Sequence, residues 1–568
     1  MNAILPDPPE RVVREGEISV FGPDFPFAYD DWIAHPSGLG ELPASALGTR
    51  VAIIGAGVAG TVAAHELAKL GLDPVVYEAG RIGGRLRSER FDGPEGPLAE
   101  LGGMRFPRSA RAFAHYADLL GLERRPFPNP LTEAAGTTVV DLAGTPRLAR
   151  TIDDLPLAFR EMAAAWNEAL RCEAAFDELQ AAMRARDPAA VRAAWEPLVH
   201  AWDDRTFYDF IANAPAFRRL SFRHREIFGQ VGFGTGGWDS DFRNTMLEIL
   251  RVVLTECDDH QDYIVGGAES LPRGLWQSAP TCRHWPAGTS PRSLNGGTTR
   301  TGVSRLVRLD PDRIAVTDRY GTTDVFPVVL ATCQSWLLTT GISTDETLFS
   351  QDHWMAMDRT SYMQSAKTFV MVDRPFWKDT DPRTGDPVMS MTLTDRLTRG
   401  TYLFEGESDD APAVMCLSYT WMSDALKMLP LPPERRVELA LDALGKIYPD
   451  VDVRRHIVGR PLSVSWEADP NFLGAFKGAL PGHYRYNRRM YAHFMQRDFL
   501  PEQRGIFIAG DDVSWTPGWA EGAVQTALNA VWGIVNHLGG RTPEDNPGPG
   551  DRFDELAPVE LEADRTGP

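Results

Sequence analysis

The chain has 568 residues, of which 43% are apolar, and its formal net charge is −20 at pH 7. A chain of this length exceeds what one hydrophobic core serves, so we expect two or three domains. The negative charge argues against a nucleic-acid partner and against binding to an anionic membrane surface. No run of about 18 apolar residues predicts a membrane span.

The cysteines and the N-terminal segment bear on the compartment. Five cysteines are scattered without paired spacing, which predicts neither a zinc site nor a disulfide framework and fits a reducing cytoplasm. Residues 1–17 lack the apolar core of a secretory signal. Residues 1–47 are predicted to form an arm, whose aromatic stretch 21–32 is expected to pack on the body or on a neighbouring subunit. We therefore expect a cytoplasmic protein without a metal site.

Residues 51–78, VAIIGAGVAGTVAAHELAKLGLDPVVYE, combine a short apolar strand, a glycine-rich turn, a helical stretch and a second strand. Gly55, Gly57 and Gly60 form G-x-G-x-x-G, which allows a tight turn, the approach of a pyrophosphate and close packing of the helix. Glu78 ends the second strand, where its carboxylate can bind ribose hydroxyls and would repel the 2′-phosphate of NADP. This stretch predicts a Rossmann-like dinucleotide-binding domain.

Three further motifs decide which dinucleotide is bound. GRIGGRLRS at residues 80–88 and LGGMRFP at residues 101–107 follow directly, and an NAD enzyme has no need of such loops there. Residues 505–529, GIFIAGDDVSWTPGWAEGAVQTALN, predict a buried strand, a carboxylate at Asp511 and a helix whose N-terminal N–H groups can face the carbonyls of a flavin. Together the motifs favour FAD, because its pyrophosphate and flavin ring extend beyond the first fold.

On these motifs the chain resembles the FAD-dependent amine oxidase superfamily, and specifically its L-amino-acid oxidase and 2-monooxygenase branch. The resemblance covers roughly residues 21–545. Within the branch it is strongest to bacterial enzymes that oxidise L-lysine, and it rests on the stretches FGPDFPFAYDDW, LGGMRFP, GTGGWDSDF, SYTWMSDALKMLP and GDDVSWTPGW. It implies an α/β fold with a Rossmann-like FAD-binding domain built from discontinuous segments, a mixed-sheet substrate domain and a helical region.

The resemblance also implies how the chain is divided. After the arm we expect FAD-binding segments at residues 48–107, 261–344 and 501–545, a helical substrate-entrance region at 108–260, a substrate-binding domain at 345–500, and a tail at 546–568. The tail is rich in proline, glycine and aspartate, so its composition predicts a loosely ordered segment.

The expected cofactor contacts come from both glycine-rich motifs and from positions that the resemblance assigns. They are Gly55, Gly57, Ala59, Gly60, Glu78, Ala79, Gly84, Arg85, Gly103, Met104, Arg105, Val303, Trp466, Gly510, Asp511, Gly518, Trp519 and Ala520. Arg85 can reach the pyrophosphate or the flavin edge. The resemblance implies that the Val303 backbone binds the adenine, and the Gly510–Asp511 turn lets a carboxylate reach the ribityl hydroxyls.

Two cations are the candidates for catalysis. The resemblance implies that Arg105, in GGMRFP, binds the substrate carboxylate as a bidentate pair, with a structural salt bridge as the alternative. It implies that Lys367, in SAKTF, holds a water near flavin N5, with a surface lysine on an edge strand as the alternative.

The remaining candidates concern the substrate side chain. Asp239 and Asp241, beside Trp238, are candidates to hold a distal ammonium or guanidinium, Asp241 being preferred, and helix capping or a solvated loop is the alternative. Cys257 lies between acids, so we expect a raised pKa, a poor nucleophile and either a pocket-lining or a structural cysteine. Three aromatic residues are expected to wall the substrate, if they are not ordinary core residues: Trp421, Phe476 and Trp519.

These assignments imply an enzyme that takes a small L-amino acid and O2. The α-hydrogen passes as hydride to flavin N5, and the imino acid is then either decarboxylated oxidatively to an amide or released and hydrolysed to a 2-oxo acid, ammonia and hydrogen peroxide. For L-lysine the amide is 5-aminopentanamide, and arginine or ornithine are alternative substrates. The sequence has no second fold for NADPH, so the substrate supplies the electrons.

Other readings remain open at this stage. A non-catalytic FAD-binding protein is disfavoured because Arg105, Lys367 and Trp519 all match, and a polyamine or monoamine oxidase is disfavoured by Arg105. The resemblance further implies a homodimer or a higher homo-oligomer.

Overall fold

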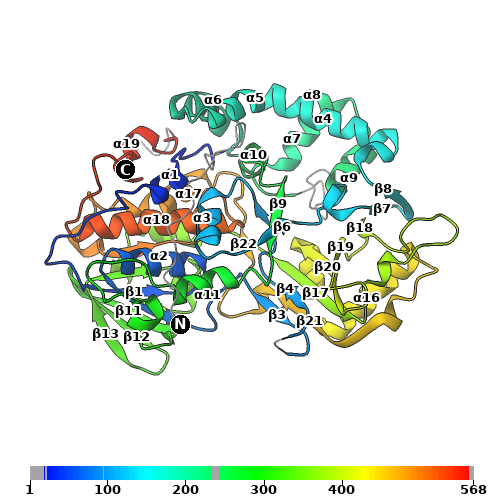
Figure 1. Cartoon of the computed structure of the whole chain (residues 1–568). Coiled ribbons are helices and arrows are strands. Elements are labelled where there is room, and N and C mark those ends of the chain that lie inside the picture. The colour runs from blue at the N-terminus through cyan, green and yellow to red at the C-terminus, as the bar shows by residue number, and fades with distance from the viewer. Residues whose placement is uncertain (1–17, 19–21, 94, 232–241, 562–568) are drawn as a thin grey trace.

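The computed structural model describes residues 18, 22–93, 95–231 and 242–561 (Figure 1). It is a mixed α/β protein, as predicted. In Figure 1 a layer of helices lies along the top, a five-stranded sheet lies at the lower left and a seven-stranded sheet lies at the lower right.

The five-stranded sheet joins distant parts of the sequence. Its strands are all parallel and lie in the order β10-β2-β1-β14-β23. Their bounds are β1 Arg50–Ile54, β2 Asp73–Glu78, β10 Arg300–Thr301, β14 Val328–Ala331 and β23 Ile506–Ile508. The central strands are apolar and buried, as a parallel sheet covered on both faces requires. This sheet confirms the predicted Rossmann-like fold.

Helices α2 (Val58–Lys69) and α18 (Ala520–His537) pack against each other beside this sheet, and α11 (Ser270–Gln277) packs on α2. The carboxylate of Glu521 on α18 accepts hydrogen bonds from the backbone of Ala112 and Phe113 at 3.1 and 2.7 Å. It thereby caps α3 (Arg111–Leu119) and ties α18 to the start of that helix.

The smaller elements connect the large layers. A second sheet has the order β13-β12-β11-β15, with β11 Val303–Asp310, β12 Arg313–Asp318, β13 Thr323–Phe326 and β15 Ser343–Thr344. Short strands are β3 Ser88–Arg90, β4 Leu98–Glu100, β5 Phe106–Pro107, β6 Arg124–Pro126, β9 Gln261–Ile264, β16 Tyr362–Met363 and β22 Phe476–Lys477. Further helices are α1 Tyr29–Ala34, α12 Pro291–Leu294, α13 Leu337–Thr340, α14 Gln351–Asp358, α17 Tyr484–Tyr491 and α19 Phe553–Leu556.

The seven-stranded mixed sheet has the order β21-β17-β20-β19-β18-β7-β8. Its strands are β7 Thr138–Leu142, β8 Thr145–Ala149, β17 Ser365–Val372, β18 Met391–Thr394, β19 Gly400–Phe404, β20 Ala413–Trp421 and β21 Ile457–Ser465. Helices α15 (Met422–Met428) and α16 (Pro433–Ile447) pack against this sheet. β7 and β8 come from the region that we expected to be mainly helical. The β-branched run of β7 pairs in parallel with β18, so this hairpin extends the sheet.

The helical layer otherwise agrees with the sequence pattern. Its helices are α4 Leu157–Glu173, α5 Phe176–Arg184, α6 Pro188–Trp202, α7 Phe207–Asn213, α8 Pro215–Arg218, α9 Phe222–Val231 and α10 Met246–Leu254. A cluster of aromatic rings holds α4, α7 and α9 together, with Trp166 contacting Phe207, Phe210 and Phe228. Among the described residues there is no helix that is both long and apolar enough to cross a membrane.

The tail that we predicted to be loosely ordered is instead packed over residues 546–561. The Asn546 side chain donates to the carbonyls of Trp32 and Gly38 at 3.1 and 2.9 Å, and the Val559 N–H donates to the Tyr484 hydroxyl at 3.2 Å. Glycine allows the chain to lie close to other side chains here, because a Cβ at Gly550 would come within 2.2 Å of Trp532. Composition alone does not reveal such long-range contacts.

Candidate active site

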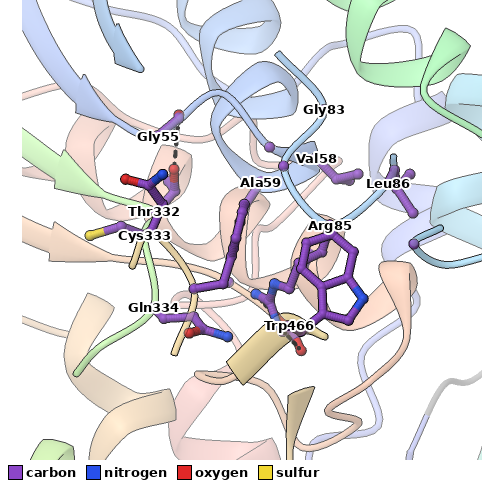
Figure 2. A pocket seen from close by; sticks show the side chains of 18 of the residues that line it. Gly55, Val58, Ala59, Gly83, Arg85, Leu86, Thr332, Cys333, Gln334 and Trp466 are labelled. Carbon is purple, nitrogen blue, oxygen red and sulfur yellow. Dashed lines mark hydrogen bonds and ion pairs between the residues drawn. The ribbon is translucent and has the colours of Figure 1, made fainter. Parts of the chain in front are cut away.

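A cavity lies at the carboxyl ends of β1, β2, β14 and β23 and extends to the seven-stranded sheet. The carboxyl edge of an open parallel sheet is where such folds bind ligands. All predicted cofactor contacts line the cavity except Gly60 and Met104. Figure 2 shows Gly55, Ala59, Arg85 and Trp466 around it.

The glycine turn has the geometry that the motif predicts. Gly55 has φ +113°, and a Cβ there would lie 2.8 Å from Thr332 Oγ1, which donates to the Gly55 carbonyl at 3.0 Å (Figure 2). A Cβ at Gly60 would lie 2.0 Å from the same carbonyl, so Gly60 serves the packing of α2 and not the cavity wall. A Cβ at Gly57 would meet only Gly83, at 4.0 Å, and would project into free space. Gly57 therefore leaves room for a bound group.

The cavity lining includes the carboxylate of Glu78 and the N-termini of the two helices α2 and α18. The Glu78 carboxylate accepts from the N–H groups of Ala56 and Gly80, both at 2.7 Å, and burial raises its pKa in spite of these bonds. The first turns of α2 and α18 line the cavity, and neither helix has a capping side chain among the described residues. Free N–H groups at two positive helix ends fit a pyrophosphate and flavin carbonyls.

Arg85 and Asp511 form an ion pair in the cavity wall. Arg85 also donates to the Ala475 carbonyl at 2.9 Å, and Asp511 accepts from the Gly518 N–H at 3.2 Å. The sequence predicted each residue separately, and the structure brings them together. The pair holds three parts of the chain in one place beside the predicted cofactor.

Arg105 lies directly before β5 and lines the cavity, and three aromatic rings surround its guanidinium. The ring centroids lie 5.6 Å away for Phe127, 5.9 Å for Tyr402 and 5.6 Å for Tyr419. The tyrosine hydroxyls contact the guanidinium, but Nη1 is buried without a hydrogen-bond partner. Over the described ranges no carboxylate forms an ion pair with Arg105, so the structural salt bridge that we considered is not seen there. The free Nη1 fits an anionic ligand.

Lys367 is a buried residue of β17 and also lines the cavity. Its Nζ donates to the carbonyls of Glu100 and Gly102 at 3.1 and 2.5 Å and lies 4.7 Å from the Tyr419 ring centroid. Burial lowers its pKa to about 8, and the nearby Arg105 acts in the same direction. The alternative of a surface lysine on an edge strand is wrong, because β17 lies between β20 and β21.

The residues predicted for the substrate side chain fall into three groups. Phe476 and Trp519 line the cavity, whereas Trp421 does not line it and packs edge-on against Phe476 with ring centroids 6.0 Å apart. Cys257 is buried and does not line this cavity, and its pKa is raised mainly by burial, with Asp258 adding to the effect. Asp239 and Asp241 lie outside the described residues.

Sequence reasoning missed several lining residues, among them Arg319, Thr332, Cys333, Gln334, Tyr419 and Phe472. The sequence does carry a signal for Tyr419, because residues two apart on a strand share a face and Trp421 is one of the predicted aromatic residues. The described residues contain no cluster of three or more side chains suited to a metal ion.

The glycine turn and the N-terminus of α2 fit the pyrophosphate of a dinucleotide, and the Gly510–Asp511 turn and the N-terminus of α18 fit a flavin. The fold and the site therefore define a flavin-dependent oxidoreductase. Comparison with known families makes this specific. The model described as "Flavin containing amine oxidoreductase" matches residues 58–535. The chain belongs to this family, and FAD is its cofactor.

Relatives of similar sequence narrow the group. The tryptophan 2-monooxygenase of Pantoea agglomerans pv. gypsophilae is 30% identical over 540 residues, covering 88% of this chain and 91% of the relative. The tryptophan 2-monooxygenase of Pseudomonas savastanoi is 30% identical over 548 residues, covering 90% of this chain and 93% of the relative. The flavin-dependent L-tryptophan oxidase of Lentzea aerocolonigenes is 27% identical, covering 85% of this chain and 98% of the relative. These relatives confirm the predicted group of flavin-dependent amino-acid 2-monooxygenases and oxidases.

Solved structures show the same fold. Putrescine oxidase bound to putrescine has a TM-score of 0.63 at 18% identity and covers 86% of this chain and 99% of its own. Cyclohexylamine oxidase from Brevibacterium oxydans IH-35A has a TM-score of 0.62 at 20% identity, covering 87% and 100%. At this identity the likeness shows the fold alone, and it confirms the predicted amine oxidase architecture.

Proposed function

We propose that the protein catalyses the oxidative decarboxylation of L-lysine by O2 to 5-aminopentanamide, CO2 and water. The observation that carries the amino-acid part of the proposal is Arg105, a cation in the cavity wall with a free Nη1. A simple amine offers no anion to this guanidinium, whereas the α-carboxylate of an amino acid can form a charge-assisted pair with it. Specificity for an amino acid over an amine follows from that pair.

The described lining also supports a reaction without a strong protein base. Its carboxylates are Glu78 and Asp511, and both are already engaged by backbone N–H groups or by Arg85. FAD, when bound, supplies the two-electron acceptor for the α-hydrogen and the route of those electrons to O2. Arg105 orients the substrate through its carboxylate. Lys367, with a pKa of about 8, would hold a proton and a positive charge in the same cavity wall at neutral pH.

Lysine is proposed as the substrate on the strength of the sequence. The stretch Trp238-Asp239-Ser240-Asp241 offers carboxylates for a distal ammonium, and it belongs to the motifs that resemble lysine-oxidising enzymes. In the proposed reaction one oxygen atom of O2 enters the amide and the other leaves as water. If the imino acid escapes instead, lysine, O2 and water give 6-amino-2-oxohexanoate, ammonia and hydrogen peroxide.

Tryptophan is the second candidate substrate. Three of the relatives described above are named for tryptophan, and the described cavity wall is rich in rings, including Tyr419, Trp466, Phe476 and Trp519. A tryptophan substrate would use these rings for its indole and would leave the acids at 239 and 241 without a role in binding.

A single assay separates these possibilities. The yellow protein is incubated in air with L-lysine, L-tryptophan, L-arginine, L-ornithine or cadaverine, and amide, 2-oxo acid and hydrogen peroxide are quantified. We expect turnover to be fastest with L-lysine and the amide to dominate. Mostly 2-oxo acid and peroxide would make the protein an oxidase, and faster turnover of cadaverine than of lysine would contradict the role of Arg105.

Matched variants then test the distal contact. Asp241→Asn should raise the KM for lysine while leaving the anaerobic bleaching of the flavin by excess substrate intact, and Asp239→Asn serves as the control of identical chemistry. If neither variant changes the KM for lysine, the proposed ammonium contact is wrong. Preference for tryptophan in the wild-type protein would move the proposal to the second candidate.

A further inference from the structure

Gln334 lines the FAD cavity and carries an acceptor that no described group satisfies. It is 2% exposed and follows β14 in the turn that also contains Thr332 (Figure 2). Its side-chain N–H donates to the Gly474 carbonyl at 3.0 Å. This bond fixes the orientation of the amide, because the reverse orientation would place two acceptors together. Oε1 is then buried without a donor among the described residues.

The neighbours of Gln334 show which part of the cavity it faces. Gly474 directly precedes Ala475, whose carbonyl accepts from Arg85 at 2.9 Å. The next residue, Ser335, donates its N–H to the carboxylate of Asp512 at 2.9 Å. Gln334 is thus connected on both sides to the loops that carry the Arg85–Asp511 pair. It lies beside the middle of the predicted cofactor site.

The chemistry of FAD decides what can satisfy an acceptor there. The pyrophosphate offers only acceptors and would be repelled by Oε1, whereas the ribityl chain between pyrophosphate and flavin offers hydroxyl donors. A buried acceptor without a donor is unfavourable, and a hydroxyl at this place removes the defect. We propose that Gln334 is an FAD-binding residue whose Oε1 accepts a hydrogen bond from a ribityl hydroxyl of the cofactor.

The test measures FAD affinity, not activity. The full chain is freed of flavin, and dissociation constants are determined by fluorescence for FAD and for analogues that each lack one ribityl hydroxyl. We expect Gln334→Met to bind FAD roughly five- to tenfold more weakly, as the loss of one buried hydrogen bond implies. Wild-type protein should lose a similar factor with one analogue, and Gln334→Met should lose nothing further with that same analogue.

A matched control is Gln180→Met, a buried glutamine of α5 that does not line the cavity. Its FAD affinity should equal that of the wild type. The proposal is overturned if both variants lose the same affinity, or if Gln334→Met still discriminates against the analogue as the wild type does. Should Gln334→Met fail to fold, the wild-type measurement decides alone, because equal affinity for FAD and every analogue excludes the contact.

Discussion

Two buried arginines are surrounded in almost the same way. Arg251, on α10, is 2% exposed, and Arg105, on the cavity wall, is 9% exposed. Each guanidinium has three aromatic rings within 6 Å of its central carbon. The rings around Arg251 are Trp195 at 5.7 Å, Tyr484 at 5.8 Å and Trp515 at 5.0 Å. Those around Arg105 are Phe127, Tyr402 and Tyr419 at 5.6, 5.9 and 5.6 Å.

The difference between them is the anion. Arg251 donates from Nε and Nη2 to the carboxylate of Asp24 at 2.6 and 3.0 Å, and both partners are buried. Arg105 has the aromatic rings but no such carboxylate among the described residues, and its Nη1 has no partner. Rings stabilise a guanidinium through their electron-rich faces without neutralising it. The charge of Arg251 is therefore neutralised within the chain, whereas none of the described residues neutralises that of Arg105, as the proposed binding of a substrate carboxylate requires.

The largest expected effect comes from Arg251→Met. This variant leaves Asp24 as a buried carboxylate without its ion-pair partner, which lowers the free energy of unfolding by about 3–5 kcal/mol. We expect a much lower denaturation midpoint at saturating FAD, while kcat/KM per bound flavin stays within about twofold of wild type. Asp24→Asn combined with Arg251→Met should recover much of the stability, because no buried charge remains. Loss of kcat/KM at an unchanged midpoint would give Arg251 a functional role and break the comparison.

Arg105→Met should show the opposite pattern. Removal of a buried, charge-assisted pair with the substrate carboxylate costs roughly 10²- to 10³-fold in kcat/KM for an amino acid. The denaturation midpoint should change little, because the variant removes a buried charge without leaving a buried carboxylate unpaired among the described residues, and the hydroxyls of Tyr402 and Tyr419 lose only a neutral contact each. Cadaverine, which lacks a carboxylate, is the control substrate and should be used no worse than by the wild type. A lowered midpoint with unchanged kinetics would make Arg105 structural.

Lys367 adds a prediction about pH. Its pKa is lowered by burial from 10.5 to about 8, so the positive charge that it places in the cavity wall is present below pH 8 and lost above it. The rate of flavin reoxidation by O2 should fall as pH rises through 8, and Lys367→Met should be about tenfold slower and flat between pH 7 and 9. Stopped-flow absorbance measures both rates. An unchanged step near pH 8 in the variant would assign the titration to another group.

The same shift fixes the sign of a stability effect. Between pH 8 and 10.5 the unfolded lysine holds a proton that the folded one has released, so stability gains from this group as pH rises through that window. Below pH 8 both states are protonated and the cost of burying the charge is fully present. The stability of wild type relative to Lys367→Met should therefore increase from pH 8 to 10.5, as urea denaturation at each pH can measure.

The two arginines also show what the sequence could and could not predict. The glycine turn was predictable because a short motif at a strand end has local geometry, whereas Arg105 and Lys367 were predicted from the family resemblance. The aromatic rings around Arg105 come from distant strands, and nothing local distinguishes Phe127 or Tyr402 from any core aromatic residue. The partners Asp24 and Arg251 are separated by 227 positions. The side-chain amide of Gln334 is oriented by the Gly474 carbonyl, 140 positions away in the sequence. Only the folded chain therefore shows that its Oε1 lacks a donor among the described residues.

Tyr402→Phe is the finest test of the comparison and has the smallest expected effect. Tyr402 is fully buried, burial raises the pKa of its hydroxyl to about 12, and that hydroxyl contacts the Arg105 guanidinium. Removing the hydroxyl leaves the ring in place, so the Arg105 guanidinium keeps its three aromatic neighbours but loses one contact that orients it. We expect KM for the amino acid to rise roughly two- to tenfold with little change in kcat, because one neutral hydrogen bond is worth about 0.5–1.5 kcal/mol. Steady-state kinetics separate the two constants. An equal fall in kcat would mean that the hydroxyl acts in the chemical step, whereas an unchanged KM would mean that the rings alone hold Arg105 in its binding orientation.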